Sequence, residues 1–307
     1  MNNVLSNFIQ GIMFDTPVSH KNLTVQFLYG QDDNDLQIRS FDEAIGDKSL
    51  EVLEIDDGGD VQHLRFINRG PRVLIQAGCL IMGLKQNRTV WSSVIINQNE
   101  ELVVPVNCIE ASRWVHKSRT GHKPRMHLYS ELRASNLKRK SQLLKQNMVH
   151  NSRVSQDEIW YNIDKKMERM GVKSPTNSAT DIYESYKADI DEYIKAFSCP
   201  DNAIGLLAMI DEHVVALDVF GNHRLFQKQY EDLLSGIALD AADKEYCEGL
   251  KKQKPMNVEQ FIESLLKAPQ KSYEAIGHGR NILMEGDVIG EALVLDNHVL
   301  NLEAFVA

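Results

Sequence analysis

Two short stretches of the sequence carry side chains whose types and spacing could do chemistry. The first ends in Lys85, Gln86, Asn87 and Arg88, which follow the glycine-bounded segment 78–83. A cation, two amides and a guanidinium that can bind in bidentate fashion suit a ligand with phosphate oxygens and ribose hydroxyls. Four consecutive polar side chains at the start of a strand are also typical of a solvated turn, so both interpretations stay open.

The glycine-bounded segment itself is not a phosphate loop. Leu84 precedes Lys85 and Gln86 follows it, so the P-loop pattern Gly-x-x-x-x-Gly-Lys-Ser/Thr is absent, as is Gly-x-Gly-x-x-Gly. A strand–turn–strand with Gly78 and Gly83 at the bends explains the pattern equally well.

The second stretch runs from Pro105 to Trp114 and contains the candidate acid or base. On a strand, Cys108 and Glu110 share one face and Arg113 lies on the other. Glu110 is the catalytic candidate, because a carboxylate beside an apolar strand can have a raised pKa. The alternative is a structural ion pair with Arg113 or with the arginine of the first stretch.

Cys108 completes the predicted ligand-binding set, together with Arg113 and Trp114. It would act as a nucleophile only with a base nearby, and His116 or His122 could serve. A small buried thiol that simply packs is the favoured interpretation.

A basic segment follows at residues 113–145, with ten Lys or Arg and one acid, Glu131, in a chain of net charge −9. The net charge argues against a protein that coats nucleic acid in general. The local excess favours a phosphate-bearing ligand, with Trp114 or Tyr129 available for stacking. Two alternatives remain: the segment docks nucleic acid or an acidic protein, or it pairs with the acidic remainder of the chain.

The remaining titratable candidates add one site residue and no metal site. His116, His122 and His127 do not match the spacing of zinc motifs, so neither a metal nor another cofactor is predicted. Asp218 ends a predicted strand before a loop, which is where catalytic residues often lie. An aspartate that caps the next helix would explain the same position.

Periodicity predicts an α+β fold. Strands are expected over residues 23–29, 50–55, 61–67, 72–76, 90–96 and 102–106, and again over 271–276, 282–285, 291–295 and 299–305. Helices are expected from the capping box Ser155–Glu158 to Met170, over 182–197 and 225–237, and after Asn257, with a buried hairpin at 203–220. We therefore predict an antiparallel β-sandwich or curled sheet from the N- and C-terminal strands, with a central helical insertion. The predicted organisation is a single domain, 1–307, with a helical, basic-start insertion at 115–200.

Composition predicts a cytoplasmic protein. The chain has 307 residues, 43% of them hydrophobic, and no apolar run approaches the roughly 20 residues of a membrane span, so no membrane partner is expected. The N-terminus lacks the layout of a secretion signal. Four widely spaced cysteines suggest reduced thiols. A homo-oligomer stays open.

With these residues in view, the chain resembles the family of ADP-ribosylglycohydrolase- and rhodanese-phosphatase-superfamily-associated proteins. The resemblance lies in Gly78-x-x-x-x-Gly-x-Lys-Gln-Asn-Arg88 and Pro105-Val-x-Cys-Ile-Glu-x-x-Arg-Trp114, and it covers nearly the full length. It continues through Gln156-x-x-Ile-Trp160, Ser174-Pro-Thr176, Leu217-Asp-Val-Phe220, Ala238-Leu-Asp-Ala241 and the segment from Gly277-His-Gly-Arg280 to Phe305. One position departs from it, because the family usually has an acid where this chain has Cys79.

The resemblance implies a link to the metabolism of NAD-derived and ADP-ribosyl compounds. We therefore expect a protein that binds, and if it is an enzyme hydrolyses, an ADP-ribosyl or NAD-derived nucleotide ligand. If the acid that Cys79 replaces is catalytic in relatives, the activity is lost or altered here, and a catalytically inert interaction protein is a third alternative. The alternative function is a nucleic-acid or acidic-protein binding module that uses the basic segment without catalysis.

Overall fold

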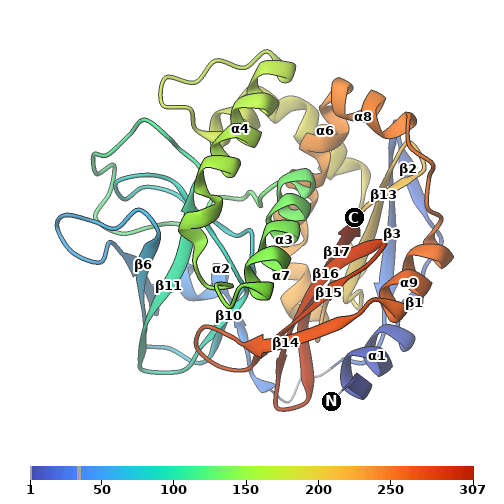
Figure 1. Ribbon diagram of the computed structural model, residues 1–307, viewed down its shortest axis with the longest axis horizontal. Helices are drawn as coiled ribbons and strands as arrows, with labels where there is room; N and C mark the ends of the chain where they lie inside the picture. The colour runs from blue at the N-terminus through green and yellow to red at the C-terminus, as the bar shows by residue number, and fades with distance from the viewer. Residues whose placement is uncertain (1, 33–35) are drawn as a thin grey trace.

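The computed structural model, which describes residues 2–32 and 36–307, is built around a nine-stranded antiparallel sheet (Figure 1). In spatial order its strands are β1 (Met13–Phe14), β3 (Leu23–Tyr29), β12 (Gly205–Ile210), β13 (His213–Phe220), β17 (His298–Val306), β16 (Val288–Leu295), β15 (Arg280–Glu285) and β14 (Gln270–Glu274), with β2 (Val18–His20) paired to β3.

The hairpin β12–β13 joins the two ends of the chain within this sheet. β12 pairs with β3, and β13 pairs with β17, which places Asp218 directly opposite Glu303. The predicted buried hairpin is confirmed, as is the α+β fold with helices between the sheet-forming ends. The arrangement puts strands from residues 23–29 and 298–306 into one sheet, and long runs of apolar side chains keep both of its faces buried.

Helices cover both faces of the large sheet. Helices α3 and α7 pack on one face, and α1 and α9 pack on the other (Figure 1). The helices are α1 (Asn2–Gln10), α2 (Phe41–Gly46), α3 (Ser130–Lys145), α4 (Gln156–Met170), α5 (Ala179–Ser185), α6 (Lys187–Ala196), α7 (His223–Ala242), α8 (Lys244–Lys251) and α9 (Val258–Lys267), with a 3-10 turn at Ser152–Ser155. Within the described residues, none of these helices is long and apolar enough to cross a membrane.

Two smaller sheets lie beside the large one, and the five-stranded one carries the polar stretches. One has the order β5 (Leu50–Leu53), β6 (His63–Asn68), β11 (Glu100–Cys108), β9 (Arg88–Val90) and β8 (Leu80–Ile81). The other consists of β10 (Val94–Ile96), β7 (Val73–Ile75) and β4 (Arg39–Ser40), in which β4 runs parallel to β7. The strands between residues 50 and 108 therefore form sheets of their own around a separate apolar core, instead of extending the C-terminal sheet.

The helix predictions were incomplete in identifiable ways. The region before residue 110, predicted to be mostly strand, also contains α1 and α2. The side chains of Ser40 and Glu43 form a capping box that starts α2, a signal that was present in the sequence. The predicted helix over 182–197 is interrupted at Tyr186, which ends α5 and begins α6. The capping box predicted at Ser155 depends on a side chain outside the described part of the structure.

Candidate functional site

The two polar stretches lie side by side because β9 pairs with the end of β11. Arg88 stands opposite Cys108 in antiparallel register, and the Ile109 amide donates to the Asn87 carbonyl at 3.0 Å. The pairing gathers the residues that we call the motif cluster: Lys85, Gln86, Asn87, Arg88, Cys108, Glu110, Arg113 and Trp114. All the predicted ligand-binding residues are therefore in one place, whereas Asp218 is not.

Glu110 and Arg113 form a closed hydrogen-bonded pair. Arg113 Nε donates to Glu110 Oε1 at 2.9 Å, and its Nη2 donates to Oε2 at 2.6 Å. The other guanidinium hydrogens go to the carbonyls of Gly83, Leu84 and Val115 and to an Asn87 side-chain oxygen. Because a guanidinium has five N–H groups, Arg113 has no donor to spare for a ligand.

The Glu110 carboxylate is fully buried, and its oxygens are likewise occupied by hydrogen bonds within the protein. Besides Arg113, it accepts hydrogen bonds from the Asn87 backbone N–H at 3.0 Å and from the Thr176 hydroxyl at 2.8 Å. Burial raises the pKa of Glu110, but these donors outweigh burial and hold the pKa below its ordinary value. The carboxylate is thus held ionised, which is the ion-pair interpretation with Arg113 as the partner.

Two further segments buttress the motif cluster and were not among the predicted site residues. The Gln156 side chain binds the backbone of Cys108 twice, as acceptor from N–H and donor to C=O, both at 2.8 Å. The hydroxyls of Ser178 and Thr180 accept hydrogen bonds from the Asn87 side-chain Nδ2 at 3.2 and 3.3 Å. Gln156 lies in a motif of the family resemblance, whereas Ser178 and Thr180 had no sequence signal, since hydroxyls in a connector are common.

Cys108 is a buried thiol. Its Sγ donates to the Gln86 side-chain oxygen at 2.9 Å and lies 3.3 Å from the Val61 carbonyl oxygen. Burial raises the pKa of Cys108 to about 12, so the thiolate that a nucleophile requires is scarce at neutral pH. The packing interpretation of this cysteine fits these contacts.

Arg88 is the exception in this well-satisfied cluster. Its side chain is fully buried, and its Nε donates to the Val61 carbonyl at 3.1 Å. Within the described part of the chain, its Nη1 and Nη2 atoms are buried without any hydrogen-bond partner. Trp114, 40% exposed, has its ring centroid 5.5 Å from Arg88 Cζ and 5.4 Å from Lys85 Nζ. A buried guanidinium without partners at its Nη atoms, with an accessible indole beside it, is the feature of this region that the described protein contacts leave open.

Asp218 belongs to a second polar network, beneath α3. Arg133 Nη1 donates to Asp218 Oδ2 at 3.0 Å, and Arg133 also binds Glu303 on the neighbouring strand. Gln76, which lies two residues before Gly78, donates to Asp218 Oδ1 at 3.0 Å. The alternative role of Asp218 as a helix cap is wrong, because the Asn222 side chain caps α7.

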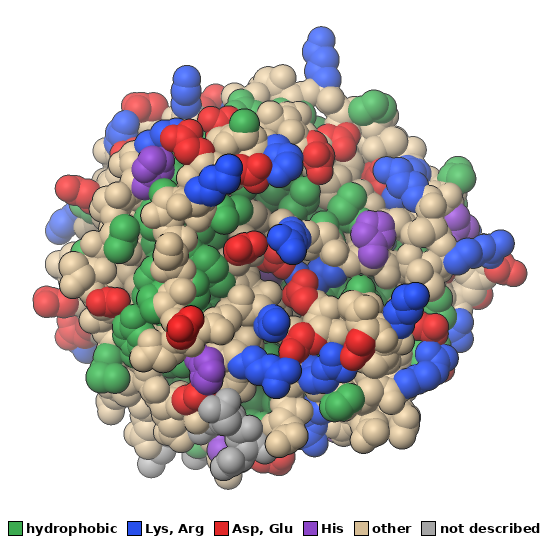
Figure 2. Space-filling view, turned by 180° about the vertical axis from the view of Figure 1, so that it is seen from behind, with side chains coloured by type: hydrophobic (Ala, Val, Ile, Leu, Met, Phe, Trp, Pro, Cys, Tyr) green, Lys and Arg blue, Asp and Glu red, His purple; other side chains and the backbone are tan. Residues whose placement is uncertain are grey.

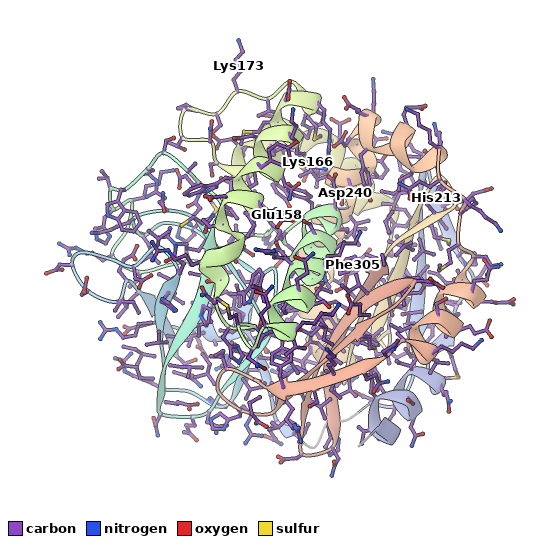
Figure 3. The ribbon with its side chains drawn as sticks, in the orientation of Figure 1. Glu158, Lys166, Lys173, His213, Asp240 and Phe305 are labelled. Carbon is purple, nitrogen blue, oxygen red and sulfur yellow. The ribbon has the colours of Figure 1, made fainter. Side chains whose placement is uncertain are left out.

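Three acids of this network stand in a row across β13, β17 and β16. Asp218 and Glu291 are the cross-strand neighbours of Glu303, and α3 supplies the two cations, Arg133 and Lys140. Burial raises the pKa of Glu303 to about 7 despite both cations. Figure 3 labels Phe305, whose ring lies 5.0 Å below the Arg133 guanidinium carbon.

The glycine-bounded segment follows the strand–turn–strand interpretation. Gly78 and Gly83 both have positive φ, at 84° and 92°. A Cβ on Gly78 would lie 2.5 Å from His127 Cε1, so lack of space as well as the positive φ requires glycine at this position. Cys79 is fully buried, and burial raises its pKa to about 11.

Most cations of the basic segment are paired with acids of the same chain. Seven of its ten cations form ion pairs with acids of this chain, among them Lys123 with Asp42 and Lys145 with Glu285. Figure 2 shows acidic and basic side chains interspersed over the back face, not a continuous basic surface. Pairing with the acidic remainder of the chain accounts for most of the segment's excess.

A third charged cluster was missed by sequence reasoning. Lys166 on α4 is fully buried and binds Asp240 at 2.6 Å and Asp243 at 3.2 Å, near the end of α7 (Figure 3). Its ammonium lies 4.4 Å from the Tyr129 ring centroid. Opposite charges on two distant helices give no local pattern, so only Asp240, through the motif Ala238–Ala241 of the family resemblance, had a sequence signal.

One surface cleft lies apart from the motif cluster and from the Asp218 network. A cleft of about 710 Å³ lies where α6 ends beside α7, lined by Phe197, Tyr230, Asp232 and neighbouring charged side chains. No member of the motif cluster or of the Asp218 network is among the described residues that line it. In the described ranges, moreover, no group of three or more His, Cys, Asp or Glu is arranged to hold a metal ion.

Comparison with known proteins gives one match. The model of the ARG and Rhodanese-Phosphatase-superfamily-associated Protein domain, in which ARG denotes ADP-ribosylglycohydrolase, matches residues 11–305. No curated protein and no solved structure matched the chain.

Proposed function

Because the chain belongs to the family of the ARG and Rhodanese-Phosphatase-superfamily-associated Protein domain, we propose that it binds a phosphate-bearing nucleotide of the ADP-ribosyl class at the motif cluster. The family's association with ADP-ribosylglycohydrolases supports only the ligand class, since association is weaker support than a site. The site itself carries the rest of the proposal.

The observation that carries it is the unpartnered guanidinium of Arg88. An arginine does not escape burial by losing its proton, because its pKa is too high. Burying a charged group without partners costs several kcal/mol. The Nη1 and Nη2 hydrogens therefore call for an acceptor that the described protein residues do not supply. A phosphate oxygen pair matches this planar fork in bidentate geometry.

Two neighbours of Arg88 support a nucleotide in preference to a bare anion. Lys85 Nζ donates to the carbonyls of Asp57 at 2.5 Å and Gly58 at 2.7 Å, which leaves one of its three hydrogens for a ligand. Trp114 presents a partly exposed ring on which a base can stack. In this proposal Glu110 and Arg113 hold the cluster in shape, and their hydrogen bonds give them no part in the chemistry.

Isothermal titration with ADP-ribose, NAD and AMP tests the proposal. We expect binding that Arg88→Ala weakens by roughly 10- to 100-fold, the usual effect of losing hydrogen bonds to a charged group. Arg119→Ala is the matched control, because Arg119 is an exposed cation of the basic segment and lies outside the motif cluster. Absence of heat with all three ligands at millimolar concentration would refute the proposal, as would equal affinities for the two variants.

Trp114→Leu separates stacking from phosphate contact. If a base stacks on the indole, this variant should bind the nucleotides more weakly while its response to inorganic phosphate stays that of the unchanged protein. Quenching of tryptophan fluorescence on titration, lost in Trp114→Leu, gives a second readout. A nucleotide affinity that does not respond to this substitution would remove the base from the proposal.

A further inference from the structure

A second unpartnered group lies beside Arg88. Glu54 follows β5, is 6% exposed, and accepts the Lys85 amide hydrogen on Oε1 at 2.8 Å. Its other oxygen, Oε2, is buried and has no hydrogen-bond partner among the residues that the structure describes. No role was expected for Glu54, because a glutamate at the end of an alternating strand is ordinary.

Glu54 and Arg88 face the same small region. The space beside Gly59 defines it: a Cβ there would lie 3.3 Å from Glu54 Oε2, 3.2 Å from Trp114 Cζ2 and 3.0 Å from Lys85 Cδ. Trp114 in turn borders Arg88. Burial lowers the pKa of Arg88, and the nearby thiol of Cys108 and the charge of Glu54 oppose that effect.

The two groups have opposite hydrogen-bonding requirements that a fully ionised phosphate group does not meet. Arg88 requires an acceptor, whereas Glu54 Oε2 requires a donor. A ligand that satisfies both carries an oxyanion and a hydroxyl close together. A ribose phosphate has this combination, and carboxylates commonly recognise ribose through its hydroxyls. The structure also shows no ion pair between these two residues that would satisfy both without a ligand.

We propose that Glu54 is the specificity-determining residue of the site and accepts a hydrogen bond from a ribose hydroxyl of a ligand whose phosphate binds Arg88. This inference rests on the proposed function and adds the class of ligand, a ribosyl phosphate with a free diol. Lys85 binds two carbonyls of the turn at residues 56–59. Because the Arg88 and Glu54 atoms are buried, ligand entry in this proposal requires that turn to move aside.

Titration with AMP and 2′,3′-dideoxy-AMP tests the inference in the full-length protein. The unchanged protein should bind AMP about tenfold or more tightly than the dideoxy analogue, because the buried carboxylate oxygen stays unpaired with the latter. Glu54→Gln keeps an acceptor for the Lys85 amide but replaces Oε2 by an NH₂ group. This variant should bind both nucleotides with similar affinity. Glu51 is a half-buried glutamate of β5 with 40% side-chain exposure, and Glu51→Gln should keep the discrimination.

The possible results separate this inference from the proposed function. Equal affinities of the unchanged protein for the two nucleotides, or discrimination retained in Glu54→Gln, would overturn the role of Glu54. Arg88-dependent phosphate binding would then stand alone. Absence of AMP binding would also overturn the inference, and the proposed function would fall with it only if ADP-ribose and NAD gave no heat either.

Discussion

Replacing each arginine of the motif cluster by methionine should have opposite effects on stability. All three guanidinium nitrogens of Arg113 donate hydrogen bonds to the protein, whereas Arg88 makes one hydrogen bond to it. Methionine suits both positions, because it is unbranched and adapts to irregular space. We expect Arg113→Met to lower the free energy of unfolding strongly, and Arg88→Met to leave it unchanged or raise it.

The magnitudes follow from what each substitution leaves behind. Arg113→Met strips the buried Glu110 carboxylate of its cation, and breaking such a pair from one side costs about 3–5 kcal/mol. Arg88→Met loses one hydrogen bond, worth about 1 kcal/mol. It also removes a buried charge without partners, whose burial costs several kcal/mol. The two variants should therefore differ by at least about 3 kcal/mol.

Urea unfolding at pH 7, followed by circular dichroism, measures both free energies of unfolding without added ligand. Titration of the same preparations with ADP-ribose shows whether the stable Arg88→Met protein has lost ligand binding. If Arg88→Met were as unstable as Arg113→Met, Arg88 would be satisfied within the fold. The observation that carries the proposed function would then be invalid.

Three further perturbations test the rest of the structure. Lys166→Met should cost about 3–5 kcal/mol in urea unfolding, because it leaves two buried aspartates with less compensation; the exposed neighbour Lys165→Met should change little. Between pH 4.5 and about 7 the folded state keeps the Glu303 proton that the unfolded state releases, so stability should fall as pH rises through this window. Glu303→Gln should flatten that slope, and an unaltered slope would contradict the raised pKa. Gly78→Ala should be more destabilising in thermal melts than Gly171→Ala, since both have positive φ but only the former meets another side chain.

The order of elements was largely readable from periodicity, because period-two and period-3.6 patterns are local. The strands at residues 23–29, 205–220 and 298–306, and helices α4, α7 and α9, follow from their own sequences. Partition of the strands among three sheets did not, since pairing depends on contacts between distant segments.

Sequence by itself singled out the two polar stretches, because their side chains interrupt apolar strand patterns that are local. The pairing of β9 with β11, which brings the two stretches together, was decided by the tertiary structure. Only the tertiary structure decided what each residue does there. Glu110 and Arg113 proved to satisfy each other, whereas Arg88 and Glu54 kept buried atoms without partners in the described fold. Asp218 forms an ion pair with Arg133 and so belongs to another network. The physical reason is that hydrogen-bond satisfaction is a property of the whole surroundings of a side chain, and most of those surroundings come from remote parts of the chain.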